Sequence, residues 1–293
     1  MISASQVKDL REKTGAGMMD CKHALEATNG DMDAAIDWLR EKGISKAMKK
    51  AERIAAEGVA DITIDGNKAA ILELNSETDF VAKNEEFTSL VKEIGATLVK
   101  SDAKTLEDAL ALKTTEGTVN DSIIAKTAKI GEKLSLRRFT IVTKSDKEVF
   151  GSYIHMGGKI AALVVLDGAN ADVAKDVAMQ AAAMRPIYTN SAEVPSDVLE
   201  KEKDIQREEL KNEGKPEAAI EKILVGKINK YYEEVCLENQ IFIKAENKET
   251  VADYVKANGG TVKSMVRYEV GEGMEHRNED FAAEVAKQVA DVK

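Results

Sequence analysis

An internal repeat constrains the fold of this 293-residue chain more than any other sequence feature. The segment 66–75 (GNKAAILELN) aligns with the segment 158–167 (GKIAALVVLD), and each follows a stretch with alternating apolar residues. Glycine-containing turns at 65–66 and 157–158 divide each copy into two strands, which is typical of β-hairpins. Since a helical pattern follows each copy, the sequence predicts two α+β halves of like topology, although ten aligned positions do not establish a duplication. An extra strand at 138–143 is expected ahead of the second copy.

The predicted fold class is α+β, with a two-part core of antiparallel sheets backed by helices. In the first core half, helical patterns run over 81–99 and 123–136. In the N-terminal module, Asp31 is expected to begin the third helix and Gly43 to end it. The predicted domains are an N-terminal three-helix (UBA-like) module (1–45), a basic linker helix (46–56), core half one (57–140), core half two (141–195 and 239–270), an inserted antiparallel helical hairpin (196–238) and a C-terminal module (271–293) with a helix at 279–292.

The charge of the chain favours protein partners. A net charge of −10 argues against nucleic acid or an anionic membrane as the main partner, because those affinities depend on basic residues. The basic segment 42–53 is the local exception, and a solvated linker helix is the favoured interpretation. No apolar run approaches the roughly 20 residues that span a bilayer. With only two cysteines and no secretion signal at the N-terminus, the chain is expected to be cytoplasmic.

No catalytic constellation is visible in the sequence. The three histidines lie outside any HExxH motif or triad-like spacing, and no GxxxxGK[ST] phosphate loop is present. The carboxylates are scattered over predicted helix faces, so they suggest no acid/base pair. The sequence therefore predicts a protein that is not an enzyme and that holds neither a metal nor a cofactor.

The segment Thr78-Asp79-Phe80-Val81-Ala82 lies where a predicted strand gives way to a predicted helix. Either Thr78 or Asp79 is suited to the N-cap, because both side chains accept from the unpaired N–H groups of a first helical turn. At the start of a helix, a large apolar side chain is either tucked into the core or presented outward. Local spacing alone favours Phe80 as a core anchor.

Three motifs bear on that choice. They are LREKTGAGMMDCK at 10–22, TDFVA at 78–82 and YEVGEG at 268–273. In this order and at these separations they closely resemble the bacterial elongation factor Ts family, and the resemblance covers essentially the whole chain. It implies a guanine nucleotide exchange factor for elongation factor Tu, the GTPase that delivers aminoacyl-tRNA to the ribosome.

The resemblance also implies which residues bind the GTPase. Asp79 and Phe80 would enter its nucleotide-binding domain and disturb the Mg²⁺ site, so that GDP leaves, while Thr78 and Val81 shape the turn. Further expected contacts are Arg11, Met18 and Met19 in the N-terminal module, Ile130 and Gly131 in the AKIGE segment, and His155 at a hairpin tip.

Two questions stay open at the level of sequence. The rival function is a helical adaptor or chaperone-like binding protein that uses the three-helix module to grip unrelated partners. The helical hairpin has too little apolar surface to be buried all round, so it is expected to project and is a candidate homodimer contact.

Overall fold

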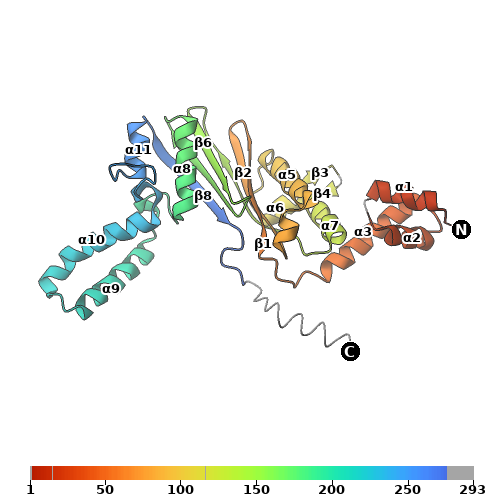
Figure 1. Cartoon of the computed structure of the whole chain (residues 1–293), viewed down its shortest axis with the longest axis horizontal. Coiled ribbons are helices and arrows are strands. Elements are labelled where there is room, and N and C mark those ends of the chain that lie inside the picture. The colour runs from red at the N-terminus through yellow and green to blue at the C-terminus, as the bar shows by residue number, and fades with distance from the viewer. Residues whose placement is uncertain (1, 15, 116, 276–293) are drawn as a thin grey trace. The chain divides into compact units, whose positions relative to one another are not determined.

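Residues 2–14, 16–115 and 117–275 are described by the computed structural model of the chain (Figure 1). Helices and antiparallel sheets follow one another along it, which confirms the α+β fold class. These residues divide into two compact units, one drawn from the described residues of 2–59, 72–139 and 270–275 and the other from 60–71 and 140–269. The helix predicted at 279–292 lies outside the described residues, and the predicted domain boundaries stay predictions.

Three helices form the N-terminal module: α1 (Ala4–Thr14), α2 (Met18–Ala27) and α3 (Met32–Met48). Buried apolar residues of all three, such as Leu10, Leu25 and Ala35, form a small core. Asp31 caps α3 as expected, since its Oδ1 accepts from the N–H of Ala34 at 3.0 Å. The expected end at Gly43 is wrong: α3 continues through this buried glycine, because there it packs against α7.

The first sheet contains β1 (Glu57–Asp65), β2 (Lys68–Ser76) and β5 (Ser135–Thr143) in the order β1-β2-β5. The strand expected at 138–143 therefore does not belong with the second hairpin, and that assignment is wrong. It begins earlier and pairs with β2, which is buried along nearly its whole length and needs a hydrogen-bonded neighbour on each side.

Between β2 and β5 lie α4 (Asp79–Ala82), α5 (Glu85–Val99), α6 (Leu106–Ala111), β3 (Lys113–Thr114), β4 (Gly117–Thr118) and α7 (Val119–Ile130). The single helix predicted over 81–99 is interrupted, because Asn84 caps a new helix by accepting from the N–H of Glu86 at 2.8 Å. The helix predicted over 123–136 ends early, at Gly131. That residue has φ 93°, a left-handed conformation that ends helices and favours glycine.

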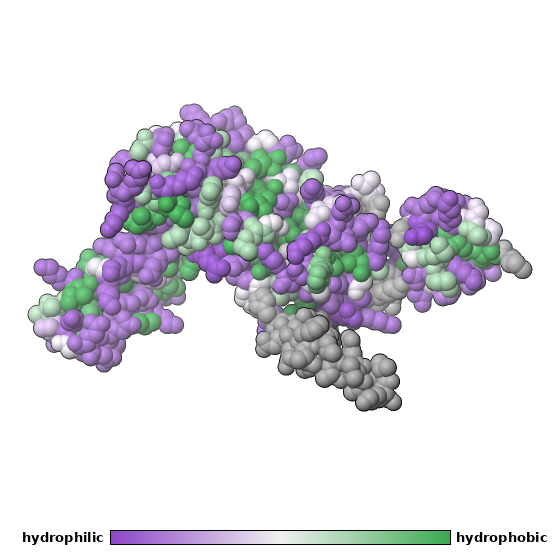
Figure 2. Space-filling model, viewed as in Figure 1, coloured by the Kyte–Doolittle hydropathy of each residue, from purple (hydrophilic) through white to green (hydrophobic). Residues whose placement is uncertain are grey.

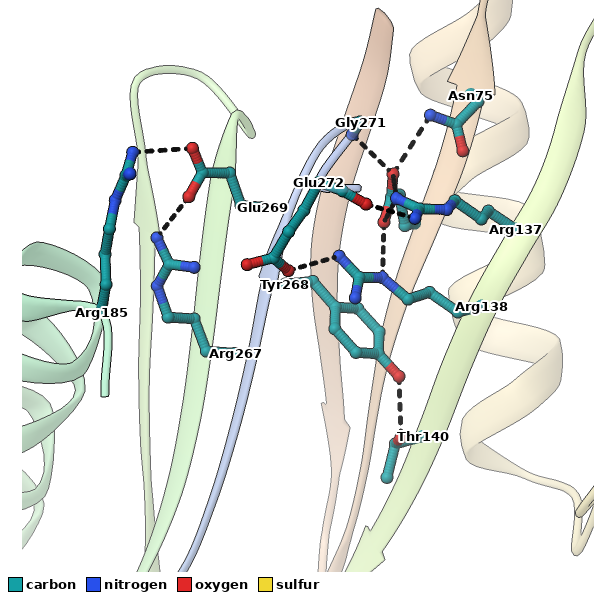
Figure 3. Close-up of polar contacts among 11 residues, drawn as sticks. Asn75, Arg137, Arg138, Thr140, Arg185, Arg267, Tyr268, Glu269, Gly271 and Glu272 are labelled. Carbon is teal, nitrogen blue, oxygen red and sulfur yellow. Dashed lines mark hydrogen bonds and ion pairs between the residues drawn. The ribbon is translucent and has the colours of Figure 1, made fainter. Parts of the chain in front are cut away.

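A buried carboxylate lies inside the first compact unit. Glu73 of β2 is fully buried and accepts hydrogen bonds from Arg137 Nη1 at 3.0 Å, Arg138 Nε at 2.6 Å, Asn75 Nδ2 at 3.1 Å and the N–H of Gly271 at 2.9 Å (Figure 3). Burial alone raises the pKa of Glu73, but the bonds from Gly271 and Arg137 and the charge of Arg138 outweigh it, so the pKa lies below its ordinary value. Glu73 thereby ties the YEVGEG motif to the sheet.

The second sheet contains β6 (Glu148–His155), β7 (Ile160–Asp167) and β8 (Thr261–Glu269), all antiparallel, in the order β6-β7-β8. As in the first sheet, a hairpin is followed by helices and a third strand then pairs with the second, which confirms the predicted like topology. α8 (Ala171–Met184) packs on this sheet. A Cβ at Gly151 would lie only 1.9 Å from the carbonyl oxygen of Ala174, so the close approach of α8 requires glycine there.

The helical hairpin is formed by α9 (Ser196–Asn212) and α10 (Glu217–Val235). Leu210, Ile220, Leu224 and Ile228 are buried along it, while the face seen in Figure 2 is mostly hydrophilic. Short 3₁₀ turns at Ser191–Glu193 and Leu237–Asn239 flank the hairpin, and α11 (Val251–Ala257) leads to β8. Dimerisation through the hairpin stays a prediction.

Candidate partner-binding site

The segment 78–82 forms the start of α4, directly after β2. Thr78 has extended backbone angles (φ −127°, ψ 156°), and its Oγ1 accepts from the N–H of Val81 at 3.4 Å. Of the two predicted candidates, Thr78 is therefore the N-cap. Asp79 occupies the first helical position, where a negative charge is favourable, and its Oδ2 lies 2.7 Å from Nζ of Lys83.

Phe80 faces solvent, with 81% of the residue exposed. The burial favoured by local spacing is therefore wrong. Ala82 is only 7% exposed, and side chains two positions apart on a helix point about 160° away from each other. Because α4 buries Ala82, it turns Phe80 outward. The site thus presents an exposed aromatic ring beside an acidic side chain.

Glu132, in the loop after α7, forms hydrogen bonds to the turn at residues 77–78 that precedes α4. Its Oε2 accepts from the N–H groups of Glu77 at 3.1 Å and of Thr78 at 3.0 Å. Its Oε1 accepts from the hydroxyl of Thr78 at 2.7 Å. The sequence interpretation missed Glu132, although it follows the predicted contact pair Ile130-Gly131 directly.

Glu77 makes the reciprocal contact. Its Oε1 accepts from the N–H of Lys133 at 2.6 Å, and Arg53 Nη1 lies 3.2 Å from the same oxygen. The ammonium of Lys133 donates in turn to the carbonyl oxygens of Ala51 at 2.7 Å and Arg53 at 2.9 Å. Three segments meet here: the chain after α3, the turn before α4 and the loop after α7. Part of the basic segment 42–53 is thus bound to the core rather than freely solvated.

The predicted contacts of the N-terminal module are exposed. Arg11 lies in the last turn of α1, and Met18 and Met19 lie in the first turn of α2 with 59% and 57% of each residue exposed. The two turns follow one another along the chain, so the three side chains lie at one end of the module. Cys21 behind them is buried, and that burial raises the pKa of its thiol.

The remaining predicted contacts lie in different units. Ile130 is half-buried at the end of α7, and the carbonyl of Gly131 accepts from the ammonium of Lys50. Both belong to the same compact unit as Thr78, and Glu132 joins their loop to the turn. His155 lies exposed at the end of β6 in the other unit, where its Nδ1 is 3.4 Å from the hydroxyl of Tyr153.

Comparison with known proteins bears on the whole chain. The family model described as Elongation factor TS matches residues 77–272, a range that includes the turn and Glu132. The protein named Elongation factor Ts from Pediococcus pentosaceus is 54% identical over 288 residues, with 98% of each chain covered. That from Lactiplantibacillus plantarum is 52% identical over 290 residues, with 99% of each chain covered. The chain belongs to the elongation factor Ts family.

Membership of the elongation factor Ts family makes the chain a translation elongation factor, which takes part in protein biosynthesis. The resemblance drawn from the three sequence motifs is confirmed. The candidate site described above consists of the exposed ring of Phe80, its acidic neighbour Asp79 and the carboxylate of Glu132 that binds the turn.

Two further findings concern the part of the chain that the structure describes. Among residues 2–14, 16–115 and 117–275, no group of three or more histidine, cysteine or carboxylate side chains could hold a metal ion. Within the same ranges, every helix is too short or too polar to cross a membrane.

Proposed function

We propose that the chain is the guanine nucleotide exchange factor of elongation factor Tu. The observation that supports this most is Phe80, a large apolar side chain that a capped turn holds in solvent. An exposed apolar ring contributes no burial free energy to folding. Its exposure is explained if a partner surface buries the ring in a complex.

The proposed mechanism is a displacement and involves no covalent step. Phe80 and Asp79 enter the nucleotide-binding domain of the GTPase and disturb its Mg²⁺ site. The metal ion is the main counter-charge for the phosphates of GDP, so losing it weakens GDP binding. The chain then holds the nucleotide-free GTPase until GTP binds. It acts as a binding protein, with no catalytic residue and no cofactor.

Burial of the Phe80 ring alone supplies too little binding free energy to shift the nucleotide equilibrium. Burying Phe80 in a partner contributes about 2–3 kcal/mol. Shifting a nucleotide equilibrium by about 10⁴ takes roughly 5.5 kcal/mol of differential binding. The other proposed contacts, namely Arg11, Met18, Met19, Ile130, Gly131 and His155, must supply the remainder. Because coupling between sites is reciprocal, GDP lowers the affinity for this protein as much as this protein lowers the affinity for GDP.

A direct test follows the release of a fluorescent GDP analogue from elongation factor Tu in a stopped-flow instrument. We expect the wild-type protein to accelerate release and Phe80→Ala to slow it by about 30- to 150-fold, the equivalent of burying one phenylalanine. Leu106→Ala removes another exposed apolar side chain from the same unit and should leave release unchanged.

Wild-type protein that leaves GDP release at its spontaneous rate would contradict the proposal. A pull-down from bacterial lysate then separates the rival function, since an exchange factor captures one dominant GTPase and an adaptor captures several unrelated proteins.

A further inference from the structure

The turn before α4 contains backbone N–H groups that no strand or helix pairs, which the sequence does not reveal. β2 ends at Ser76 and α4 begins at Asp79, so the N–H groups of Glu77 and Thr78 belong to neither element. Backbone donors next to a folded core need partners. A helix of four residues is also too short to be stable by itself, so α4 depends on what surrounds it.

We propose that Glu132 is the positioning residue that presets this turn for entry into the nucleotide-binding partner, an inference that rests on the exchange function proposed above. Both of its carboxylate oxygens are used, Oε2 by the N–H groups of Glu77 and Thr78 and Oε1 by the hydroxyl of Thr78. Hydrogen bonds to an ionised acceptor are stronger than those between neutral groups. One side chain thus replaces the strand or helix partner that these donors lack.

The bond to the Thr78 hydroxyl also determines how that residue caps the helix. A hydroxyl has one proton and two lone pairs. Because Glu132 takes the proton, the lone pairs of Thr78 Oγ1 are left to accept from the N–H of Val81. Glu132 therefore orients the cap of α4, and through it the direction in which Phe80 points.

Glu132 is itself held in place by the same segment that it holds. The N–H of Lys133 donates to the carboxylate of Glu77, so segments 77–78 and 132–133 bind each other through side chain and backbone in both directions. The left-handed Gly131 allows this loop to turn back immediately after α7. These contacts join residues 54 to 56 positions apart in the chain.

The hydrogen bonds from Glu132 to Glu77 and Thr78 matter more for function than for the fold, because what they mainly determine is the orientation of the exposed Phe80 ring. A turn that is already ordered before binding loses less conformational freedom when a partner closes on it. Without Glu132, the ring would have to be ordered during binding. Exchange should then slow although Phe80 is still present.

The test compares Glu132→Gln with Glu86→Gln. The glutamine keeps one acceptor oxygen but puts an N–H₂ group where an acceptor was. Glu86 is a matched control, because it too is a partly exposed carboxylate, and its side chain binds the ammonium groups of Lys126 and Lys129 in α7. We expect Glu132→Gln to slow GDP release about 10-fold and Glu86→Gln to leave it unchanged.

Two additional measurements separate positioning from a general loss of structure. Hydrogen exchange of the Glu77 and Thr78 amides should become at least 10-fold faster in Glu132→Gln, with the rest of the chain unchanged. In a double-mutant cycle, Glu132→Gln should have almost no further effect in a Phe80→Ala background, because no ring is left to orient. A purely structural role predicts equal effects in both backgrounds.

The outcomes distinguish this inference from the function on which it rests. If the wild-type protein does not accelerate GDP release, the exchange function fails and the role of Glu132 fails with it. If the wild type is active and Glu132→Gln matches Glu86→Gln in release and in hydrogen exchange, only the role of Glu132 is overturned. Additive effects with Phe80→Ala would also overturn it.

Discussion

Glu73 and Glu132 belong to the same compact unit and both accept from backbone N–H groups, but their surroundings differ. Glu73 is fully buried and binds two guanidinium groups, with Gly271 as its backbone donor. Glu132 is half-buried, and the bonds described above come from neutral amides and a hydroxyl. The difference indicates that one carboxylate stabilises the fold while the other shapes a surface turn.

The largest expected effect is on stability at Glu73. Glu73→Gln removes the charge between Arg137 and Arg138, and breaking a buried ion pair costs about 3–5 kcal/mol of the free energy of unfolding. Urea denaturation measures this cost. Glu86→Gln, which breaks partly exposed pairs, should cost about 1 kcal/mol or less. Equal costs would remove the distinction between the buried and the exposed carboxylate.

The contribution of Glu73 should also depend on pH. The pKa of Glu73 is lowered by folding, so its stabilisation is fully present above the ordinary value of 4.5 and is lost as the pH falls through the lower folded value. The difference in the free energy of unfolding between wild type and Glu73→Gln should therefore shrink from about pH 6 to about pH 3. A difference that grows on acidification would show that folding raises the pKa of Glu73 instead of lowering it.

A smaller effect is expected at the turn. Thr78→Ala removes the cap of α4 and the hydroxyl bound to Glu132, and losing an N-cap costs about 1 kcal/mol. Thr97→Ala is the control, because the hydroxyl of Thr97 bonds back to the carbonyl of Glu93 within α5, and alanine favours a helix. Chemical denaturation of both variants should show a clear loss for the first alone.

The smallest effect on stability is expected at Phe80. Since the ring is 81% exposed, Phe80→Ala should change the free energy of unfolding by no more than about 0.5 kcal/mol. Phe87→Ala, seven positions along the chain and fully buried, should cost about 3–5 kcal/mol. A large loss of stability in Phe80→Ala would restore the core-anchor interpretation and contradict the proposed function.

Much of the architecture follows from local patterns. The two hairpins, the N-terminal helices and the pair α9/α10 were all predictable, because turn residues and apolar periodicity act over short stretches. Two of the errors arose where a contact distant in sequence decides. Gly43 does not end α3, since α7 packs there, and the segment at 138–143 joins β2 because that strand needs a second neighbour.

The same division applies to the site. The sequence by itself determined that Thr78 and Asp79 stand at a boundary between strand and helix, and its motifs indicated the family. The resemblance implied an outward Phe80, against the local spacing, and the tertiary structure shows the ring in solvent. Only the tertiary structure revealed that Glu132 binds the turn. The physical reason is that periodicity shows which side chains are apolar, whereas burial and hydrogen bonding depend on which segments the fold places beside them.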